Sequence, residues 1–364
     1  MSEDVFEKLR EKISVSPLKL PKKKQILEIL KTLYTEEEAN IIIENFGMPF
    51  FDRFAPKRIA KKLGKDPEEI EAMFEELVKK GLLFKAGKKY SNLPLLPGMM
   101  EGFFSSKKSS NKDKEIIANL YEAYLPDFTG SLAASNYPWI RIMPTMKSIE
   151  INESIESDYE ILPFEIVKQQ IENNESIVVI PCMCRSANSQ LSKELKRDCD
   201  KPLETCLSFG IFADWFIDAG LGRKISKEEA IQIVKECEEK GLIHSTTNYQ
   251  DEPLFICNCC SDCCTFIRGL KEFGNPKMFA RSNFIAVVND NCNRCEVCVD
   301  KCVFEAIEPI DGANGVEILE EKCMGCGNCI NYCPNDAIRL VKVRNEVPEK
   351  TVMECFTRFD NERI

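Results

Sequence analysis

The sequence has one histidine and two tryptophans in 364 residues, and it lacks the glycine-rich loops that hold nucleotides. No G-x-G-x-x-G follows an expected strand. The segment nearest to a Walker A loop is GLLFKAGK from Gly81, which misplaces the second glycine by one position and has no Ser or Thr after the lysine. We therefore expect no NAD, flavin or ATP site, hence no nucleotide cofactor.

Long apolar runs are also missing. No stretch approaches the ~18 apolar residues that a membrane helix needs, and the first residues, MSEDVFEKLR, lack an apolar signal segment. We expect a cytoplasmic protein without a membrane span. The length suits two or three domains of ~100 to 200 residues each.

Charge is unevenly distributed along the chain, whose net charge is −10. Residues 1–110 hold 21 Lys and Arg against 17 Asp and Glu, whereas the remainder holds 28 against 42. All 19 cysteines lie in the acidic remainder. An acidic surface can steer a basic partner towards redox centres, and ordinary solvation of the surface explains it equally well.

A run of four cysteines occurs twice near the C-terminus, with an offset of 31 positions. Each run reads C-x2-C-x2-C-x3-C, a spacing typical of iron-sulfur proteins. The first run is Cys292, Cys295, Cys298 and Cys302, and the second is Cys323, Cys326, Cys329 and Cys333. A zinc site or a disulfide framework is the weaker alternative, because zinc modules mostly use paired C-x2-C or Cys/His sets.

On this repeat, residues 282–343 resemble the dicluster 2x(4Fe-4S) ferredoxin domain. The resemblance implies two 4Fe-4S clusters in which the fourth cysteine of each run ligates the other cluster. Cluster 1 would then use Cys292, Cys295, Cys298 and Cys333, and cluster 2 would use Cys302, Cys323, Cys326 and Cys329. Val303 departs from the pattern, since the second run carries Pro334 at that place. Such clusters imply a reducing, anaerobic cytoplasm.

Nine further cysteines in the middle of the chain follow a different pattern. One group follows an expected strand at residues 176–180, with two of its cysteines further along the chain, and the other group directly follows an expected strand at 254–256. They are predicted to enclose an additional Fe-S cluster, with zinc or reduced structural thiols as alternatives. These candidates are Cys182, Cys184, Cys199, Cys206, Cys257, Cys259, Cys260, Cys263 and Cys264. If the two strands are neighbours, the two cysteine-rich loops face each other. Cys237 lies in an amphipathic helix and is expected to be buried.

Two other residues in this region are candidates for a role at a metal site. Arg185 follows Cys184 and can donate hydrogen bonds to a cluster, or lie on the surface. His244, the only histidine, is more often structural than a ligand, and a metal or proton role is its alternative.

The central region, residues 115–281, alternates helix and strand signals, which predicts an α+β or α/β domain. Helices are expected at 116–125, 163–173, 209–219, 226–240 and 265–273. Residues 139–143 and 148–151 are expected to be extended.

The N-terminal region reads as short helices followed by a basic ribbon. Thr35 with Glu38 predicts a capping box, Gly64 ends a helix that starts at Pro56, and Asp66 caps the next one. This order resembles a winged helix-turn-helix. The helix that Asp66 caps is the one that would read DNA in such a fold, and it holds five glutamates, which would repel phosphates. DNA binding is therefore disfavoured, and a docking or homodimerising module is favoured.

Together these patterns predict an α+β multidomain protein. We expect a winged-helix-like domain at 1–104, a linker at 105–114, a Cys-rich α/β domain at 115–281, a ferredoxin-like dicluster domain at 282–345 and a tail at 346–364. The predicted function is relay of single electrons between a redox partner protein and a further cluster in the central domain. Two alternatives stay open. One is a reductase whose active site is the central cluster and which forms a subunit of an anaerobic oxidoreductase. The other is a redox-sensing winged-helix regulator.

Overall fold

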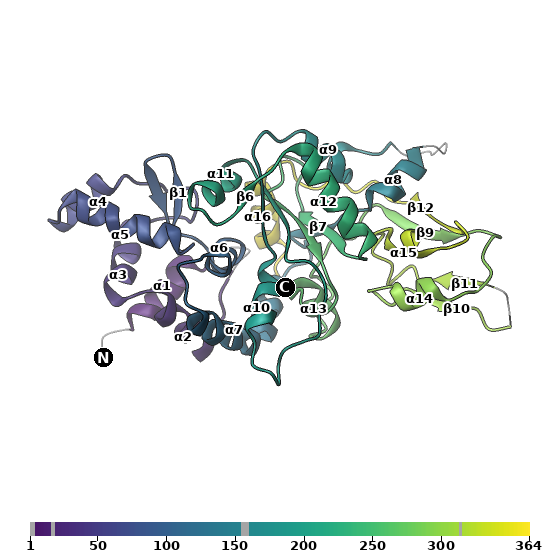
Figure 1. Cartoon of the computed structure of the whole chain (residues 1–364), viewed down its shortest axis with the longest axis horizontal. Helices are drawn as coiled ribbons and strands as arrows, with labels where there is room; N and C mark the ends of the chain where they lie inside the picture. The colour runs from purple at the N-terminus through teal and green to yellow at the C-terminus, as the bar shows by residue number, and fades with distance from the viewer. Residues whose placement is uncertain (1–3, 16–18, 154–159, 313–314) are drawn as a thin grey trace. The chain divides into compact units, whose positions relative to one another are not determined.

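The computed structural model describes residues 4–15, 19–153, 160–312 and 315–364. It combines helices and sheets, and so belongs to the α+β class (Figure 1). The chain divides into two compact units. Unit 1 comprises Met1–Ala134, Val178–Glu204 and Ile211–Lys224, and unit 2 comprises Ser135–Ile177, Thr205–Gly210 and Ile225–Ile364.

Unit 1 is mainly helical. Its elements are α1 (Val5–Ile13), α2 (Lys24–Leu33), α3 (Glu36–Asn45), α4 (Pro56–Leu63), α5 (Pro67–Lys79), β1 (Phe84–Ala86), β2 (Lys89–Ser91), η1 (Leu95–Met99), α6 (Met100–Ser105), α7 (Asn111–Leu132), β4 (Ile177–Pro181), α10 (Met183–Gln190), α11 (Gly210–Asp218) and β6 (Arg223–Lys224). Strands β1 and β2 form an antiparallel hairpin, and β4 pairs with β6. Asn111–Leu132 includes the last four residues of the predicted linker.

The local signals of the N-terminal region are confirmed. Thr35 and Glu38 form a reciprocal capping box at the start of α3. Gly64 ends α4 with a left-handed φ of 65°, and the side chain of Asp66 accepts a hydrogen bond at the start of α5. The order helix, helix, hairpin is as expected, and its likeness to a winged helix-turn-helix stays a prediction.

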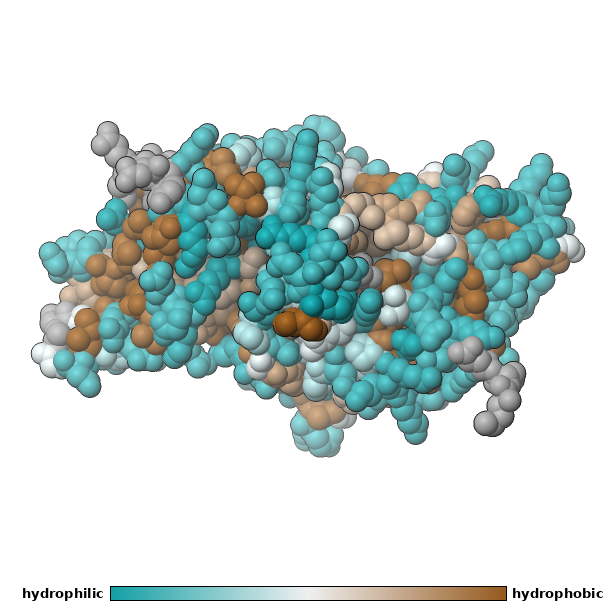
Figure 2. Space-filling view, turned by 180° about the vertical axis from the view of Figure 1, so that it is seen from behind, coloured by the Kyte–Doolittle hydropathy of each residue, from teal (hydrophilic) through white to brown (hydrophobic). Residues whose placement is uncertain are grey.

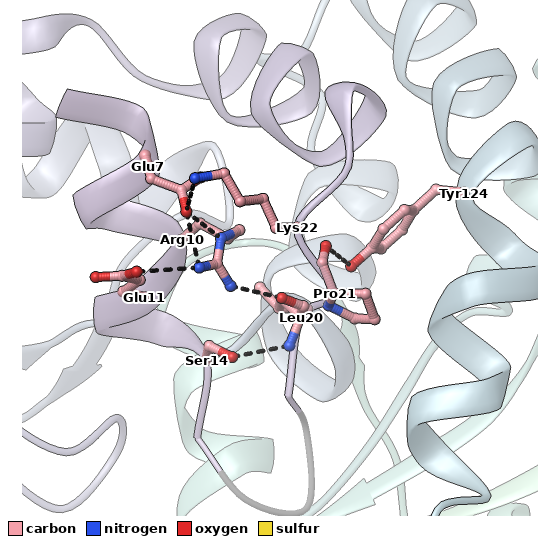
Figure 3. A network of polar contacts seen from close by, with 8 residues as sticks. All are labelled: Glu7, Arg10, Glu11, Ser14, Leu20, Pro21, Lys22 and Tyr124. Atoms are coloured by element: carbon pink, nitrogen blue, oxygen red, sulfur yellow. Dashed lines mark hydrogen bonds and ion pairs between the residues drawn. The ribbon is translucent and has the colours of Figure 1, made fainter. Parts of the chain in front are cut away.

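A polar network joins the N-terminal helix of unit 1 to the segment after it (Figure 3). Arg10 donates to Glu7 at 2.9 Å and to the carbonyl oxygen of Leu20 at 2.7 Å. Lys22 forms an ion pair with Glu7 at 3.0 Å, and Tyr124 of α7 donates to the carbonyl oxygen of Pro21 at 3.0 Å. These contacts tie α1 to α7 through residues 20–22.

Unit 2 contains the remaining strands and all eight cysteines of the repeat. Its elements are β3 (Ile140–Ile142), α8 (Met146–Glu153), η2 (Pro163–Glu165), α9 (Val167–Glu172), β5 (Glu204–Phe209), α12 (Lys227–Glu239), β7 (Ile243–Thr247), β8 (Phe255–Cys259), α13 (Thr265–Lys271), β9 (Phe284–Val288), α14 (Val297–Lys301), β10 (Ile307–Pro309), β11 (Val316–Ile318), α15 (Asn328–Tyr332), β12 (Ile338–Lys342) and α16 (Val352–Asn361).

The larger sheet of unit 2 has the strand order β3-β7-β8-β5. These three pairings are antiparallel, as in α+β sheets, so the α/β label for the central region is wrong for these strands. The two cysteine-rich loops were expected to face each other if the strands at 176–180 and 254–256 are neighbours. Strands β7 and β5 occupy the two edges of β8, so this condition is not met.

Residues 148–151 are helical, and the expectation of an extended segment there is wrong. They belong to α8, where the hydroxyl of Ser148 donates to the carbonyl oxygen of Thr145 at 2.7 Å. The buried carboxylate of Glu238 on α12 accepts a hydrogen bond from Met146 N–H at 2.6 Å. This tertiary contact satisfies a backbone donor at the start of the helix. A prediction from neighbouring residues alone cannot include it, because Glu238 is distant in the sequence.

The face of the molecule drawn in Figure 2 is mostly hydrophilic, with smaller groups of apolar residues between the polar ones. In the part of the chain that the structure describes, none of the helices has the length and apolar character needed to cross a membrane. The apolar side chains of the C-terminal region form a core that includes Phe284, Ile307, Ile330, Ile338 and Leu340.

Candidate metal centres

The sequence repeat of unit 2 is also a repeat of the backbone. Helix α14 (Val297–Lys301) and helix α15 (Asn328–Tyr332) are related by the same 31 positions. So are three pairs of residues with positive φ, namely Arg294 and Gly325, Glu296 and Gly327, and Glu305 and Asp336. Strand β9 pairs with β12 and β10 with β11, so each copy supplies one strand to each pair. The two cysteine runs therefore lie on matching loops.

Glycine is required in the second loop and not in the first. A Cβ on Gly325 would lie 2.1 Å from Ser282 Oγ and 2.2 Å from the carbonyl oxygen of Phe284. The equivalent Arg294 has the same sign of φ, 57°, and carries a side chain. The second loop is therefore packed closely against Ser282 and against Phe284 of β9.

The pKa shifts of the thiols indicate which cysteines are neighbours. Burial raises the pKa of Cys298 to about 11, and the charges of Cys333, Cys292 and Cys295 add to the effect. Burial likewise raises the pKa of Cys326 to about 12, with contributions from Cys302 and Cys323. Cys298 thus has both other thiols of its triplet and the last thiol of the other run as neighbours, and Cys326 has Cys323 of its own run and the last thiol of the other. Cluster assembly needs thiolates and would release protons here.

Backbone N–H groups also approach the last sulfur of each run. Ala306 N–H donates to Cys302 Sγ at 3.3 Å, and Ala337 N–H donates to Cys333 Sγ at 3.2 Å. Such N–H···S bonds stabilise negative charge on sulfur and tune the reduction potential of a bound cluster.

A pocket in unit 2 tests whether a cluster fits. Its lining contains four thiols, those of Cys302, Cys323, Cys326 and Cys329. Apolar groups make up much of the rest, among them Ala286, Ile307, Ile318 and Leu340. Four thiols that line one mainly apolar pocket are the donor set that a 4Fe-4S cube requires, so the chemistry of the lining fits this group.

Comparison with known protein families supports 4Fe-4S binding by the second cysteine run. Residues 316–339 match the family model of a 4Fe-4S binding domain. The 4Fe-4S segment includes the second cysteine run, β11, α15 and the start of β12. The chain thus carries a 4Fe-4S binding segment and is an iron-sulfur protein. Neither the curated proteins nor the solved structures contain a match to it.

The nine central cysteines are divided between the two units. Cys182, Cys184 and Cys199 belong to unit 1, where Cys182 precedes α10 and Cys184 lies within it. The other six belong to unit 2. There Cys206 is in β5, Cys257 and Cys259 are in β8 rather than in a loop after it, and Cys260, Cys263 and Cys264 follow. That all nine serve one centre stays a prediction.

Within unit 2 these thiols form close groups. Cys257 hydrogen-bonds Cys206 and Cys259, and these contacts together with burial raise its pKa well above the ordinary value. The sulfur atoms of Cys260 and Cys263 lie within 4.8 Å of each other, in a group that could hold a metal ion. Cys259 Sγ is 3.7 Å from Ser245 Oγ of β7. The sulfur-rich end of β8 therefore presents several thiols to one small region.

His244 is fixed by polar neighbours. Its Nδ1 is 2.6 Å from Asn258 Oδ1, and its Nε2 is 3.1 Å from Glu238 Oε1. Because both ring nitrogens have partners, the structural role expected of a lone histidine is the one that the geometry favours. Asn258, between Cys257 and Cys259, has no sequence signal that marks it as the partner of His244, since the contact spans two strands.

Arg185 is buried, with 3% of its surface exposed, so the alternative of a surface arginine is wrong. Cys237 is buried in α12, as expected. Sequence reasoning missed β5, β7 and α10, which carry or flank the central cysteines. Strands β5 and β7 are short, and the polar residues of β7, such as Ser245 and Thr246, follow no alternating pattern because both faces of this strand are buried.

Proposed function

We propose that this chain is an electron-transfer protein with two 4Fe-4S clusters in its C-terminal repeat. Cys292, Cys295, Cys298 and Cys333 would hold one cluster, and Cys302, Cys323, Cys326 and Cys329 the other. The observation that carries the proposal is the pocket lined by the second set, which joins one thiol of the first run to three of the second. The match of residues 316–339 to a 4Fe-4S binding domain agrees with it.

A bound 4Fe-4S cluster accepts and releases single electrons. The chain's own residues serve this chemistry by excluding water and by supporting charge. Ile307, Ile318 and Leu340 line the second site with apolar surface. The N–H groups of Ala306 and Ala337 donate to ligand sulfurs and favour the more negative, reduced state.

We further propose that the central cysteines bind an additional metal centre, an Fe-S cluster, which exchanges electrons with the C-terminal pair and through it with a redox partner protein. The close thiols at the end of β8 support this part of the proposal. The winged-helix-like N-terminal region would serve as the docking or dimerising module. No nucleotide cofactor is required.

The experiment is metal analysis of protein purified anaerobically. We expect about eight iron and eight acid-labile sulfide per chain from the repeat and about four of each from the central site. The double variant Cys260→Ser/Cys263→Ser should lose the central iron only, and Cys326→Ser should lose iron from the repeat only. Cys237→Ala, a change at a buried thiol within α12, serves as the matched control.

Zinc in place of the four irons expected at the central site would reject the central Fe-S cluster and leave the proposal of two C-terminal clusters intact. Loss of about four iron in Cys326→Ser, with none lost in Cys298→Ser, would reject the dicluster arrangement and leave a single cluster in the second run.

A further inference from the structure

A second pocket in unit 2 has no cysteine in its lining and is rich in basic side chains. Its volume is about 710 Å³, within the range of small-molecule sites. Four cations line it, Arg141, Lys277, Arg281 and Arg358, together with the two carboxylates Glu346 and Glu362. The lining therefore carries an excess of positive charge.

Two of these cations already have partners. Arg358 forms ion pairs with Glu362 at 2.8 Å and with Glu349 at 3.0 Å. Arg281 donates to the carbonyl oxygens of Glu320 and Glu321, beside the second cysteine loop. Arg141 and Lys277 have no ion pair within 4 Å among the residues that the structure describes. They are the charges that a ligand can engage.

Arg141 is the more informative of the two. It lies on β3, is 4% exposed, and its guanidinium is 4.7 Å from the ring of Phe164. Its Nη1 is buried and has no hydrogen-bond partner within the described part of the chain. Burial lowers its pKa to about 10, which leaves it charged at neutral pH. A buried cation with an unused donor is costly unless an anion pairs with it.

The position of Arg141 is rigid. Ile142 N–H donates to the carbonyl oxygen of Ala280 at 3.0 Å, and Ala280 N–H donates to that of Ile140 at 2.8 Å, so both neighbours of Arg141 bond to the segment that contains Lys277. Glu165, the carboxylate with the largest effect on Arg141, is held by Lys342 at 2.6 Å. The carboxylate of Glu165 is therefore committed to Lys342, and Glu346, which also lines the pocket, has a smaller effect on the pKa of Arg141.

We propose that this pocket binds a small oxyanion, a carboxylate or a phosphate, with Arg141 as its principal ligand and Lys277 as the second. A guanidinium presents paired N–H donors that match the oxygens of either group. The apolar residues Phe279, Val347 and Pro348 leave room for a carbon skeleton next to the charged end. The proposal does not depend on the iron-sulfur function.

The test is isothermal titration calorimetry of the full-length, metal-loaded protein with inorganic phosphate and, separately, with succinate at constant ionic strength. We expect one of the two to bind with a stoichiometry of one per chain, which identifies the class. Arg141→Gln should weaken binding by about 10- to 100-fold and Lys277→Gln by about 3- to 10-fold. Lys235→Gln, which removes an exposed charge of α12, should leave binding unchanged.

The proposal is overturned if neither anion binds the wild type, or if Lys235→Gln weakens binding as much as Lys277→Gln does, which is the result expected of diffuse electrostatic attraction. If Arg141→Gln loses its folded circular dichroism spectrum, Lys277→Gln decides the question alone. Lys277 is only half-buried and makes no ion pair among the described residues, so its loss should not unfold the chain.

Discussion

Cys298 and Cys333 come from different copies of the repeat, yet a charge on Cys333 raises the pKa of Cys298 more than a charge on either Cys292 or Cys295 does. The last thiol of the second run is therefore a close electrostatic neighbour of the third thiol of the first. In the second run, Cys302 raises the pKa of the second thiol, Cys326, more than Cys323 does. These are the thiols that the proposed crossed ligation of two cubes would bring together.

The tight packing of the second loop leads to the first prediction. In Gly325→Ala, the new Cβ would meet Ser282 Oγ and the carbonyl oxygen of Phe284 at distances that atoms do not tolerate. The loop must move, so we expect loss of about four iron per chain and a lower thermal midpoint. Iron analysis and differential scanning calorimetry measure both effects.

Gly274→Ala is the control for that variant, because Gly274 has a similar φ of +65° and nothing within 4 Å of the added Cβ. It isolates the cost of backbone strain, about 1 kcal/mol, from the cost of the clash. Equal loss of iron in the two variants would show that the contact with Ser282 and Phe284 does not hold the loop.

The second prediction concerns Glu7 in unit 1. The hydrogen bond from Arg10 is the largest cause of its lowered pKa, and Lys22 adds to it. A lowered carboxylate pKa stabilises the folded state above the ordinary pKa of 4.5, and this stability is lost as the pH falls through the lowered value. At pH 7, Glu7→Gln should reduce the free energy of unfolding by about 1 to 2 kcal/mol, and the difference should shrink below about pH 4.

Urea unfolding can follow this change in unit 1 alone. The sequence has two tryptophans, Trp215 in unit 1 and Trp139 in unit 2, so a Trp139→Phe background leaves one fluorescent probe. Glu11→Gln is the matched control, since Glu11 also contacts Arg10 but is 58% exposed. A pH-independent effect of Glu7→Gln, or an equal effect of Glu11→Gln, would contradict the role assigned to the network.

The third prediction concerns Cys355 in α16. It is fully buried, and burial raises its pKa to about 12, so its thiolate is scarce at pH 8. Iodoacetamide should modify it at least about 100-fold more slowly in the folded protein than in 8 M urea. Peptide mass spectrometry after timed labelling measures the two rates. Similar rates in both conditions would mean that α16 is not packed as described.

The parts of the fold that sequence could predict are those fixed by local chemistry. Thr35, Gly64 and Asp66 mark helix ends correctly because capping bonds span only a few residues. The cysteine spacing pointed to the matching loops for a similar reason, since three thiols of each run come from one tight turn. The 31-residue offset then recurs in α14 and α15.

The parts that sequence missed depend on contacts between distant segments. Helix α8 starts where Glu238, some ninety positions away, accepts a bond from Met146 N–H. His244 is held by Asn258 of the adjacent strand, and the pairing of β8 with β5 and β7 determines which cysteines are near one another. Arg141 is inconspicuous in the sequence, because its importance lies in its burial.

Crossed ligation is the central claim, and a single cysteine variant tests it most directly. In Cys333→Ser, purified anaerobically and labelled with iodoacetamide, we expect Cys292, Cys295 and Cys298 to become reactive while Cys323, Cys326 and Cys329 stay protected by their cluster. Cys302→Ser should give the opposite result. Labelling of Cys323, Cys326 and Cys329 in Cys333→Ser, with the first run protected, would contradict the account and assign each cluster to a single run.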